Sequence, residues 1–172
     1  EQSDQPVRIL FAIDSSDSMA FNDPQNRHVD AIENVVARFQ NQPNVSFGIL
    51  RWGERQLREL SDPLTSDEIL FSNDLTVLQA AYTRMRQLPC QAGCSPGSPA
   101  NCNPDKYLGG TDYEGALAAV DAYIQTDVAQ SNATLAGNRY YVEFMTDGMP
   151  QSGTANGQAT RDNILRRVAQ LR

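Results

Sequence analysis

Residues 7–18 read VRILFAIDSSDS, and this stretch decides both the fold class and the first candidate site. Residues 7–13 are almost entirely apolar, which predicts a buried β-strand. Asp14, Ser16 and Ser18 then place a carboxylate and two hydroxyls at alternate positions, just where the strand ends. Such hard oxygen ligands suit Mg²⁺, Mn²⁺ or Ca²⁺, and they suit zinc or copper poorly. We therefore expect this stretch to form one wall of a metal site that other segments complete.

Composition describes an ordinary globular chain. Its 172 residues suffice for one domain with a substantial core, and hydrophobic residues make up 40% against 20% charged residues. The net charge of -7 argues against a nucleic-acid partner or an anionic membrane surface. No apolar run approaches the roughly 20 residues that span a bilayer, so we expect no direct membrane insertion.

The cysteines indicate a compartment. Cys90, Cys94 and Cys102 fall within residues 89–108, a Cys/Pro/Gly-rich stretch that we expect to be an insertion loop. Three cysteines are too few to close a tetrahedral zinc site, and the only histidine, His28, is distant in the sequence. One disulfide with one cysteine left over, or a partner outside this sequence, fits better. That favours an oxidising, extracellular or cell-surface location.

Hydrophobic spacing alternates strands with helices along the chain. Period-3.6 patterns predict helices over residues 28–40, 74–88, 113–124 and 160–171. Further apolar runs predict strands over residues 45–52 and 139–145, with a short return strand within residues 54–60. Strands separated by helices imply a Rossmann-like, doubly wound α/β fold, whose mostly parallel sheet carries helices on both faces. The return strand would add one antiparallel edge.

Two further polar residues should reach the end of the sheet that holds Asp14. Ligands of parallel sheets bind outside the carboxyl ends of the strands, and Asp147 follows a strand there as Asp14 does. Thr111, in a Gly-Gly-Thr-Asp segment, opens a helix that a loop can bring to the same edge. Purely structural interpretations of these residues stay open. Thr111 with Glu114 matches a helix capping box, and Asp147-Gly148 matches a turn.

Taken together, the three segments resemble the von Willebrand factor A domain, the family that includes integrin inserted domains. Its metal-ion-dependent adhesion site combines Asp-x-Ser-x-Ser, a distant Thr and an Asp after a later strand. The matching residues here are Asp14, Ser16, Ser18, Thr111 and Asp147. The resemblance covers nearly all of residues 1–172, read as a single domain. It departs from the family in the insertion at 89–108, on the metal face, and in lacking the usual final strand and helix.

The resemblance implies a division of labour among these five residues. Ser16 and Ser18 would bind the cation directly, and Thr111 would bind directly or through water. Asp14 and Asp147 would act mostly through bound waters and hydrogen bonds to the hydroxyls. The ion would keep an open position for a carboxylate presented by a protein or surface ligand. This implies a metal-dependent adhesion module, for example in a bacterial surface adhesin.

Other functions remain as alternatives. An intracellular relative, acting as a scaffold in a chelatase or chaperone-ATPase assembly, would use the same metal site. A Mg²⁺-dependent hydrolase of the haloacid dehalogenase type needs Asp-x-Asp after its first strand, and Ser16 stands at the second carboxylate position. His28 has no Gly-x-Ser-x-Gly nucleophile elbow to serve. We therefore expect no enzyme activity.

Overall fold

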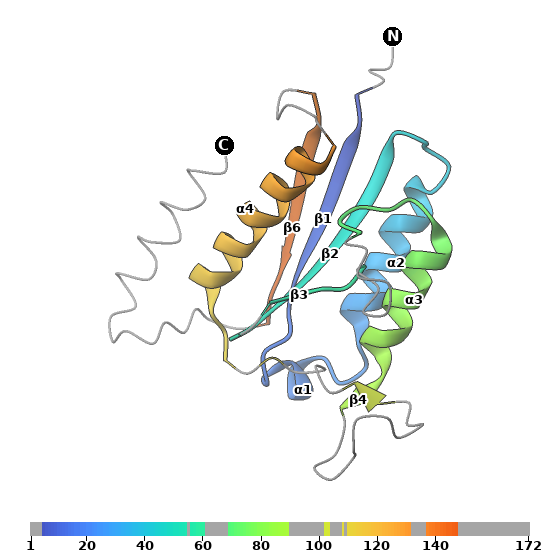
Figure 1. Ribbon diagram of the computed structural model, residues 1–172. Helices are drawn as coiled ribbons and strands as arrows, with labels where there is room; N and C mark the ends of the chain where they lie inside the picture. The colour runs from blue at the N-terminus through green and yellow to red at the C-terminus, as the bar shows by residue number, and fades with distance from the viewer. Residues whose placement is uncertain are drawn as a thin grey trace.

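A four-stranded sheet with the order β3-β2-β1-β6 forms the frame of the molecule (Figure 1). β1 (Val7–Asp14) runs parallel to both of its neighbours, β2 (Val45–Trp52) and β6 (Arg139–Met145). β3 (Gln56–Arg58) pairs antiparallel with β2 at the edge. The predicted mostly parallel sheet with one antiparallel edge strand is confirmed. This computed structural model describes residues 5–54, 56–60, 69–89, 102–103, 108, 110–131 and 137–147.

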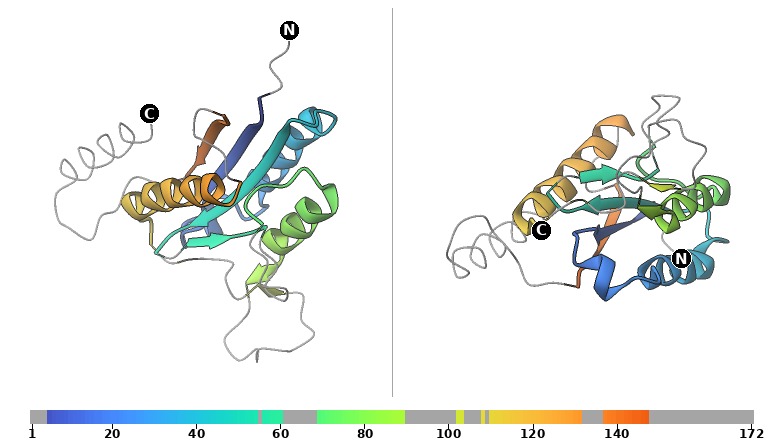
Figure 2. Two further views of the ribbon diagram at one scale, coloured as in Figure 1. Left: turned by 45° about the horizontal axis from the view of Figure 1, so that its top comes forward. Right: turned by 90° about the horizontal axis from the view of Figure 1, so that it is seen from below.

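Helices cover both faces of the sheet because successive residues of β1 point to opposite sides. Phe11 belongs to the core beneath α2 (Arg27–Phe39) and α3 (Leu75–Arg86), whereas Leu10 belongs to the core beneath α4 (Tyr113–Gln130). Figure 2 shows α2 and α3 together on one side of the sheet and α4 on the other. None of the helices in the described part of the chain has the length and apolar character that crossing a bilayer requires.

Beyond shifts of one or two residues at the ends of α2 and α3, the helices differ from the predicted ones in two places. α4 continues past residue 124 to Gln130, because residues 125–130 contain no Gly or Pro and Val128 packs on the same core as the preceding turns. A short helix, α1 (Met19–Asn22), begins directly after the Asp14–Ser18 stretch, where the hydrophobic spacing predicted no helix. Burial of Met19 accounts for this helix, since it ties the turn to the core. The helix predicted over residues 160–171 lies outside the described residues.

Short strands lie near the ends of the insertion. β4 (Leu88–Pro89) pairs in parallel with β5 (Cys102–Asn103), whereas the sequence predicted no regular element in residues 89–108. This pairing satisfies backbone groups at the base of the insertion. Most of the insertion lies outside the described residues, and no cysteine pair is seen in the part that the structure describes. The disulfide among Cys90, Cys94 and Cys102 stays a prediction.

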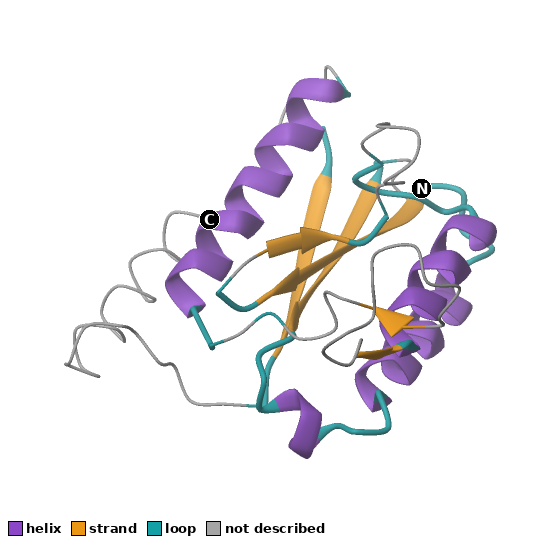
Figure 3. Ribbon diagram, turned by 60° about the horizontal axis from the view of Figure 1, so that its bottom comes forward, coloured by secondary structure: helices purple, strands orange, loops and turns teal. Residues whose placement is uncertain are grey.

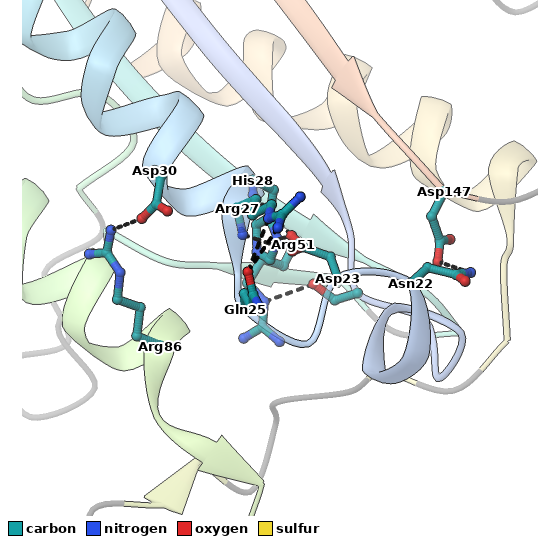
Figure 4. Close-up of polar contacts among 10 residues, drawn as sticks. Asn22, Asp23, Gln25, Arg27, His28, Asp30, Arg51, Arg86 and Asp147 are labelled. Carbon is teal, nitrogen blue, oxygen red and sulfur yellow. Dashed lines mark hydrogen bonds and ion pairs between the residues drawn. The ribbon is translucent and has the colours of Figure 1, made fainter.

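Asp23 links α1 to the start of α2. Its carboxylate accepts hydrogen bonds from the backbone N–H groups of Arg27 (2.8 Å) and His28 (2.9 Å), and it lies 2.5 Å from Nδ1 of His28 (Figure 4). Burial raises the pKa of Asp23, but these hydrogen bonds and the His28 ring outweigh it, so the pKa falls below its ordinary value. Asp23 thus satisfies the first two N–H groups of α2, which have no acceptor within the helix.

Asp23→Asn should lower the free energy of unfolding by about 1 kcal/mol at pH 7, because the charged acceptor at the helix start is lost. The folded pKa lies below the unfolded value of about 3.9, so the stabilisation is complete above that value and fades as pH falls through the folded pKa. Urea unfolding between pH 7 and pH 3 tests this, with the exposed Asp121→Asn as matched control. A stability difference that stays constant with pH would contradict it.

Candidate metal centre

The carboxyl ends of β1 and β6 bring two distant segments together. Ile13 pairs with Met145, so Asp14 and Thr146 leave the sheet side by side. Figure 3 turns this end of the sheet toward the viewer, with α1 beside the strand ends. Asp14 is fully buried there, and Ser16 is 1% exposed. The β1–β6 register therefore builds the edge that the sequence predicted for the site.

Both carboxylate oxygens of Asp14 are occupied by protein donors. The backbone N–H of Ser16 donates to Oδ1 (2.8 Å), and the hydroxyl of Thr146 donates to Oδ2 (2.8 Å). The phenol of Tyr113 in turn donates to the Thr146 hydroxyl oxygen (2.8 Å). Asp14 is thus fixed in orientation and supplies negative charge without turning either oxygen outward. Sequence reasoning missed Thr146, although its place between the strand and Asp147 is a usable signal.

A row of oxygens connects the serines to Asp147. The hydroxyls of Ser16 and Ser18 lie 3.0 Å apart and share a hydrogen bond, and Ser18 donates to Oδ1 of Asp147 (3.1 Å). Asn22, at the end of α1, donates from Nδ2 to Oδ2 of the same carboxylate (2.8 Å; Figure 4). Asn22 was also missed, and its spacing of four residues from Ser18 becomes informative only once α1 is known to be helical. Asp17 is exposed, which agrees with its place at a non-ligand position of the pattern.

Thr111 lies buried just before α4, at 7% exposure. The N-cap of this helix is Asp112, whose side chain accepts a hydrogen bond from the backbone N–H of Gly115 (2.9 Å). The capping-box interpretation is therefore wrong at its first residue, because Thr111 is not the cap. Within the described residues, no hydrogen bond joins Thr111 to the other four predicted site residues.

The backbone of Leu108 holds the start of the Thr111 loop against the Asp14 stretch. Its N–H donates to the carbonyl of Ser15 (2.7 Å), and its carbonyl accepts from the N–H of Glu54 (2.8 Å). A Cβ at Gly53 would stand 2.7 Å from the Leu108 carbonyl oxygen, so only glycine permits this approach. The loop thereby reaches the edge of the sheet that holds Asp14 three residues before Thr111.

The spacing of the hydroxyls fits a small divalent cation. Two oxygens bound to Mg²⁺ at about 2.1 Å on adjacent vertices of an octahedron are about 3.0 Å apart. The separation of the Ser16 and Ser18 hydroxyls has that value. Among the described residues, no three His, Cys, Asp or Glu side chains group as metal ligands, so an ion here would depend on hydroxyls and water. This donor set suits Mg²⁺, Mn²⁺ or Ca²⁺.

The electrostatics of the site are those of two neighbouring carboxylates. Burial raises the pKa of Tyr113, and the charges of Asp14 and Asp147 raise it further, while its hydrogen bond to Thr146 lowers it. Tyr113 therefore remains a neutral donor. Positive charge lies behind the site, where the buried Arg51 donates from Nε to the Ser15 hydroxyl (2.9 Å) and from a terminal nitrogen to Oε1 of Glu59 (2.7 Å).

Comparison with known proteins shows the fold. No family model matches the sequence, and no curated protein sequence matches it. The chain is similar in structure to the pilus adhesin SpaC from Lactobacillus rhamnosus GG in its open conformation, with a TM-score of 0.54 and 17% identity. This match covers 87% of the chain and 15% of SpaC. It is also similar to the adhesive tip pilin GBS104 of Group B Streptococcus agalactiae, with a TM-score of 0.53 and 15% identity. This match covers 85% of the chain and 46% of GBS104.

A third likeness is weaker. The vWF domain of the type V pili tip protein Mfa5 from Porphyromonas gingivalis matches at a TM-score of 0.49 and 17% identity, over 85% of this chain and 39% of that one. The chain spans less than half the length of each of these three proteins. At these identities the likeness concerns the fold alone, and the α/β fold implied by the resemblance of the sequence is confirmed.

Proposed function

We propose that this chain, which has the fold of a von Willebrand factor A domain, is a metal-dependent adhesion module of an extracellular or cell-surface protein. The observation that carries the proposal is the row of oxygens from Ser16 through Ser18 to Asp147, which joins residues 129 positions apart at one edge of the sheet. A turn or a cap alone would not require hydroxyls and a carboxylate from two strand ends to converge.

Each residue has a separate task in this proposal. The hydroxyls of Ser16 and Ser18 bind a divalent cation directly, with Mg²⁺ first and Mn²⁺ or Ca²⁺ as substitutes. Thr111 binds directly or through water, from the loop that Leu108 holds in place. Asp14 and Asp147 supply charge through hydrogen bonds and bound water, because protein donors already occupy both oxygens of Asp14.

The bound cation supplies a Lewis-acidic position that a carboxylate of a protein or surface ligand completes. Hydroxyl ligands leave more positive charge on the ion than carboxylate ligands would, which favours an anionic group from outside. The proposal includes no catalytic step. A Mg²⁺-dependent hydrolase of the haloacid dehalogenase type needs a second Asp after its first strand, and this sequence has Ser16 at that position. The extracellular or surface location rests on the cysteine content of residues 89–108.

Calorimetric titration with MgCl₂, followed by NMR titration with sodium acetate, tests the proposal. We expect Mg²⁺ to bind, and acetate to shift the amide signals of Ser16 and Ser18 only when Mg²⁺ is present. Ser18→Ala should weaken Mg²⁺ binding about tenfold or more, because a ligand and the hydrogen bond to Asp147 are lost together.

Ser131→Ala is the matched control, because this exposed serine caps the far end of the 18-residue helix α4. It should bind Mg²⁺ as the wild type does. Absence of divalent-cation binding, or acetate shifts that persist unchanged in EDTA, would overturn the proposed function.

A further inference from the structure

Phe21 is the most exposed large hydrophobic side chain in the described part of the chain. The residue is 85% exposed, against 56% for Tyr141, 42% for Leu75 and 39% for Val142. An aromatic ring that stays in water does not contribute the favourable free energy that burial of its apolar surface would give. Single exposed apolar residues are common on protein surfaces, so the position of Phe21 decides whether it has a role.

An ordered turn holds Phe21 in place. The backbone N–H of Phe21 donates to the carbonyl of Ser18 (3.0 Å), and the N–H of Asn22 donates to the same carbonyl (3.1 Å). Met19 anchors α1 from the other side, with only 7% of its surface exposed. Residues two positions apart on a helix lie nearly opposite each other, so burial of Met19 turns Phe21 outward. The backbone beneath the ring is therefore already ordered, and a partner that covers the ring has only its side-chain rotamer to fix.

Phe21 also lies next to the proposed metal site. Residues three and four positions apart share one face of a helix, and Ser18 already has helical backbone angles (φ -62°, ψ -29°). Ser18 and Asn22 both donate to Asp147, so this face of α1 is the one turned toward that carboxylate. Phe21 lies three residues after Ser18 and directly before Asn22, so it shares the face of α1 that carries both donors to Asp147.

The surrounding charge limits what kind of partner fits. Asp17, one turn before Phe21, is exposed, and the chain carries a net charge of -7. A ligand with several acidic groups would meet repulsion from Asp17 once one carboxylate has reached the ion. A ligand with a single carboxylate and a neighbouring apolar group meets no such repulsion, and its apolar group can cover Phe21.

We infer that Phe21 forms an apolar subsite beside the metal site, and that the partner is a protein segment that presents one acidic side chain next to an aromatic or aliphatic one. This inference rests on the proposed function and specifies its ligand. Phe21 provides contact area and selectivity, whereas the serines and the two aspartates provide cation binding.

Acetate and 3-phenylpropionate are the probes that separate the two contributions. In Mg²⁺, the wild type should bind 3-phenylpropionate about tenfold more tightly than acetate, because the ring covers part of Phe21. Phe21→Ser should abolish this preference while leaving the affinities for Mg²⁺ and acetate unchanged. Leu75→Ser is the matched control, since Leu75 is an exposed apolar residue at the start of α3, and it should keep the preference.

The possible outcomes distinguish the subsite from the metal site. If the wild type binds both probes equally, or if Phe21→Ser keeps the preference, the subsite is excluded and the metal site stands. If neither probe binds although Mg²⁺ does, or if Mg²⁺ does not bind, the proposed function fails, and the subsite fails with it. NMR line shapes and circular dichroism of Phe21→Ser establish that the variant is folded.

Discussion

Asp14→Asn is expected to lower the affinity for Mg²⁺ about 100-fold and to leave the fold intact. Asparagine keeps the volume of the fully buried side chain, and its carbonyl oxygen can accept from the N–H of Ser16. Its amide can donate to the Thr146 hydroxyl, which reverses one hydrogen bond without breaking the chain of contacts. The negative charge behind the serine hydroxyls is the one property that is lost.

Asp17→Asn provides the control for this charge. It removes one negative charge from the same five-residue stretch, but at an exposed position that holds none of the site residues by a side-chain contact. Calorimetry with MgCl₂ should therefore give a change of about twofold or less, of the size expected for a screened surface charge. Equal losses in the two variants would mean that general acidity, and not the placement of Asp14, governs binding.

Arg51→Met should lower the free energy of unfolding by about 3 kcal/mol, because it leaves Glu59 buried without its nearest cation. Arg51 and Glu59 are each 3% exposed and lie 2.7 Å apart. Arg84 approaches the other Glu59 oxygen at 3.6 Å and is 35% exposed, so it offsets only part of the loss. Arg51 also donates to Ser15, and its replacement should loosen the stretch that carries Ser16.

The double variant Arg51→Met/Glu59→Gln distinguishes two causes for the instability of Arg51→Met, namely lost packing and the uncompensated charge of Glu59. Removing both charges should recover more than half of the stability lost in Arg51→Met, as measured by urea unfolding at pH 7. If the double variant is as unstable as Arg51→Met or more so, the arginine acts through packing or through Ser15, and not as the counter-ion of Glu59.

The fold was predictable because its strands are strongly apolar and follow one another with regular helices between them. Residues 7–13, 45–52 and 139–145 appear as β1, β2 and β6 with nearly the predicted bounds. The convergence of Asp14 and Asp147 followed from a general rule, since both come directly after parallel strands. These predictions depend on hydrophobic patterning and chain order, which the sequence displays directly.

The features that the sequence did not predict depend on how side chains are oriented in the folded chain. Thr146 and Asn22 matter because one donates to Asp14 and the other to Asp147, contacts that span more than a hundred residues. Four residues are too few for a helical period, so α1 could not be recognised from spacing. The alternative interpretation of Thr111 as the helix cap is wrong by one position, because Asp112 caps α4 and Asp is a better N-cap residue than Thr.

The backbone contacts of Leu108 have a consequence for how such a domain could diversify. The insertion is fastened near both ends, by the β4–β5 pairing and by the hydrogen bonds of Leu108 to Ser15 and Glu54. Lengthening a loop between fixed stems adds little to the entropy of closing it. A change in the length of the chain between these stems therefore adds little to the cost of holding Leu108 against Ser15 and Glu54. Under the proposed function, the recognition surface can change in this way while the residues proposed to bind the ion keep their places.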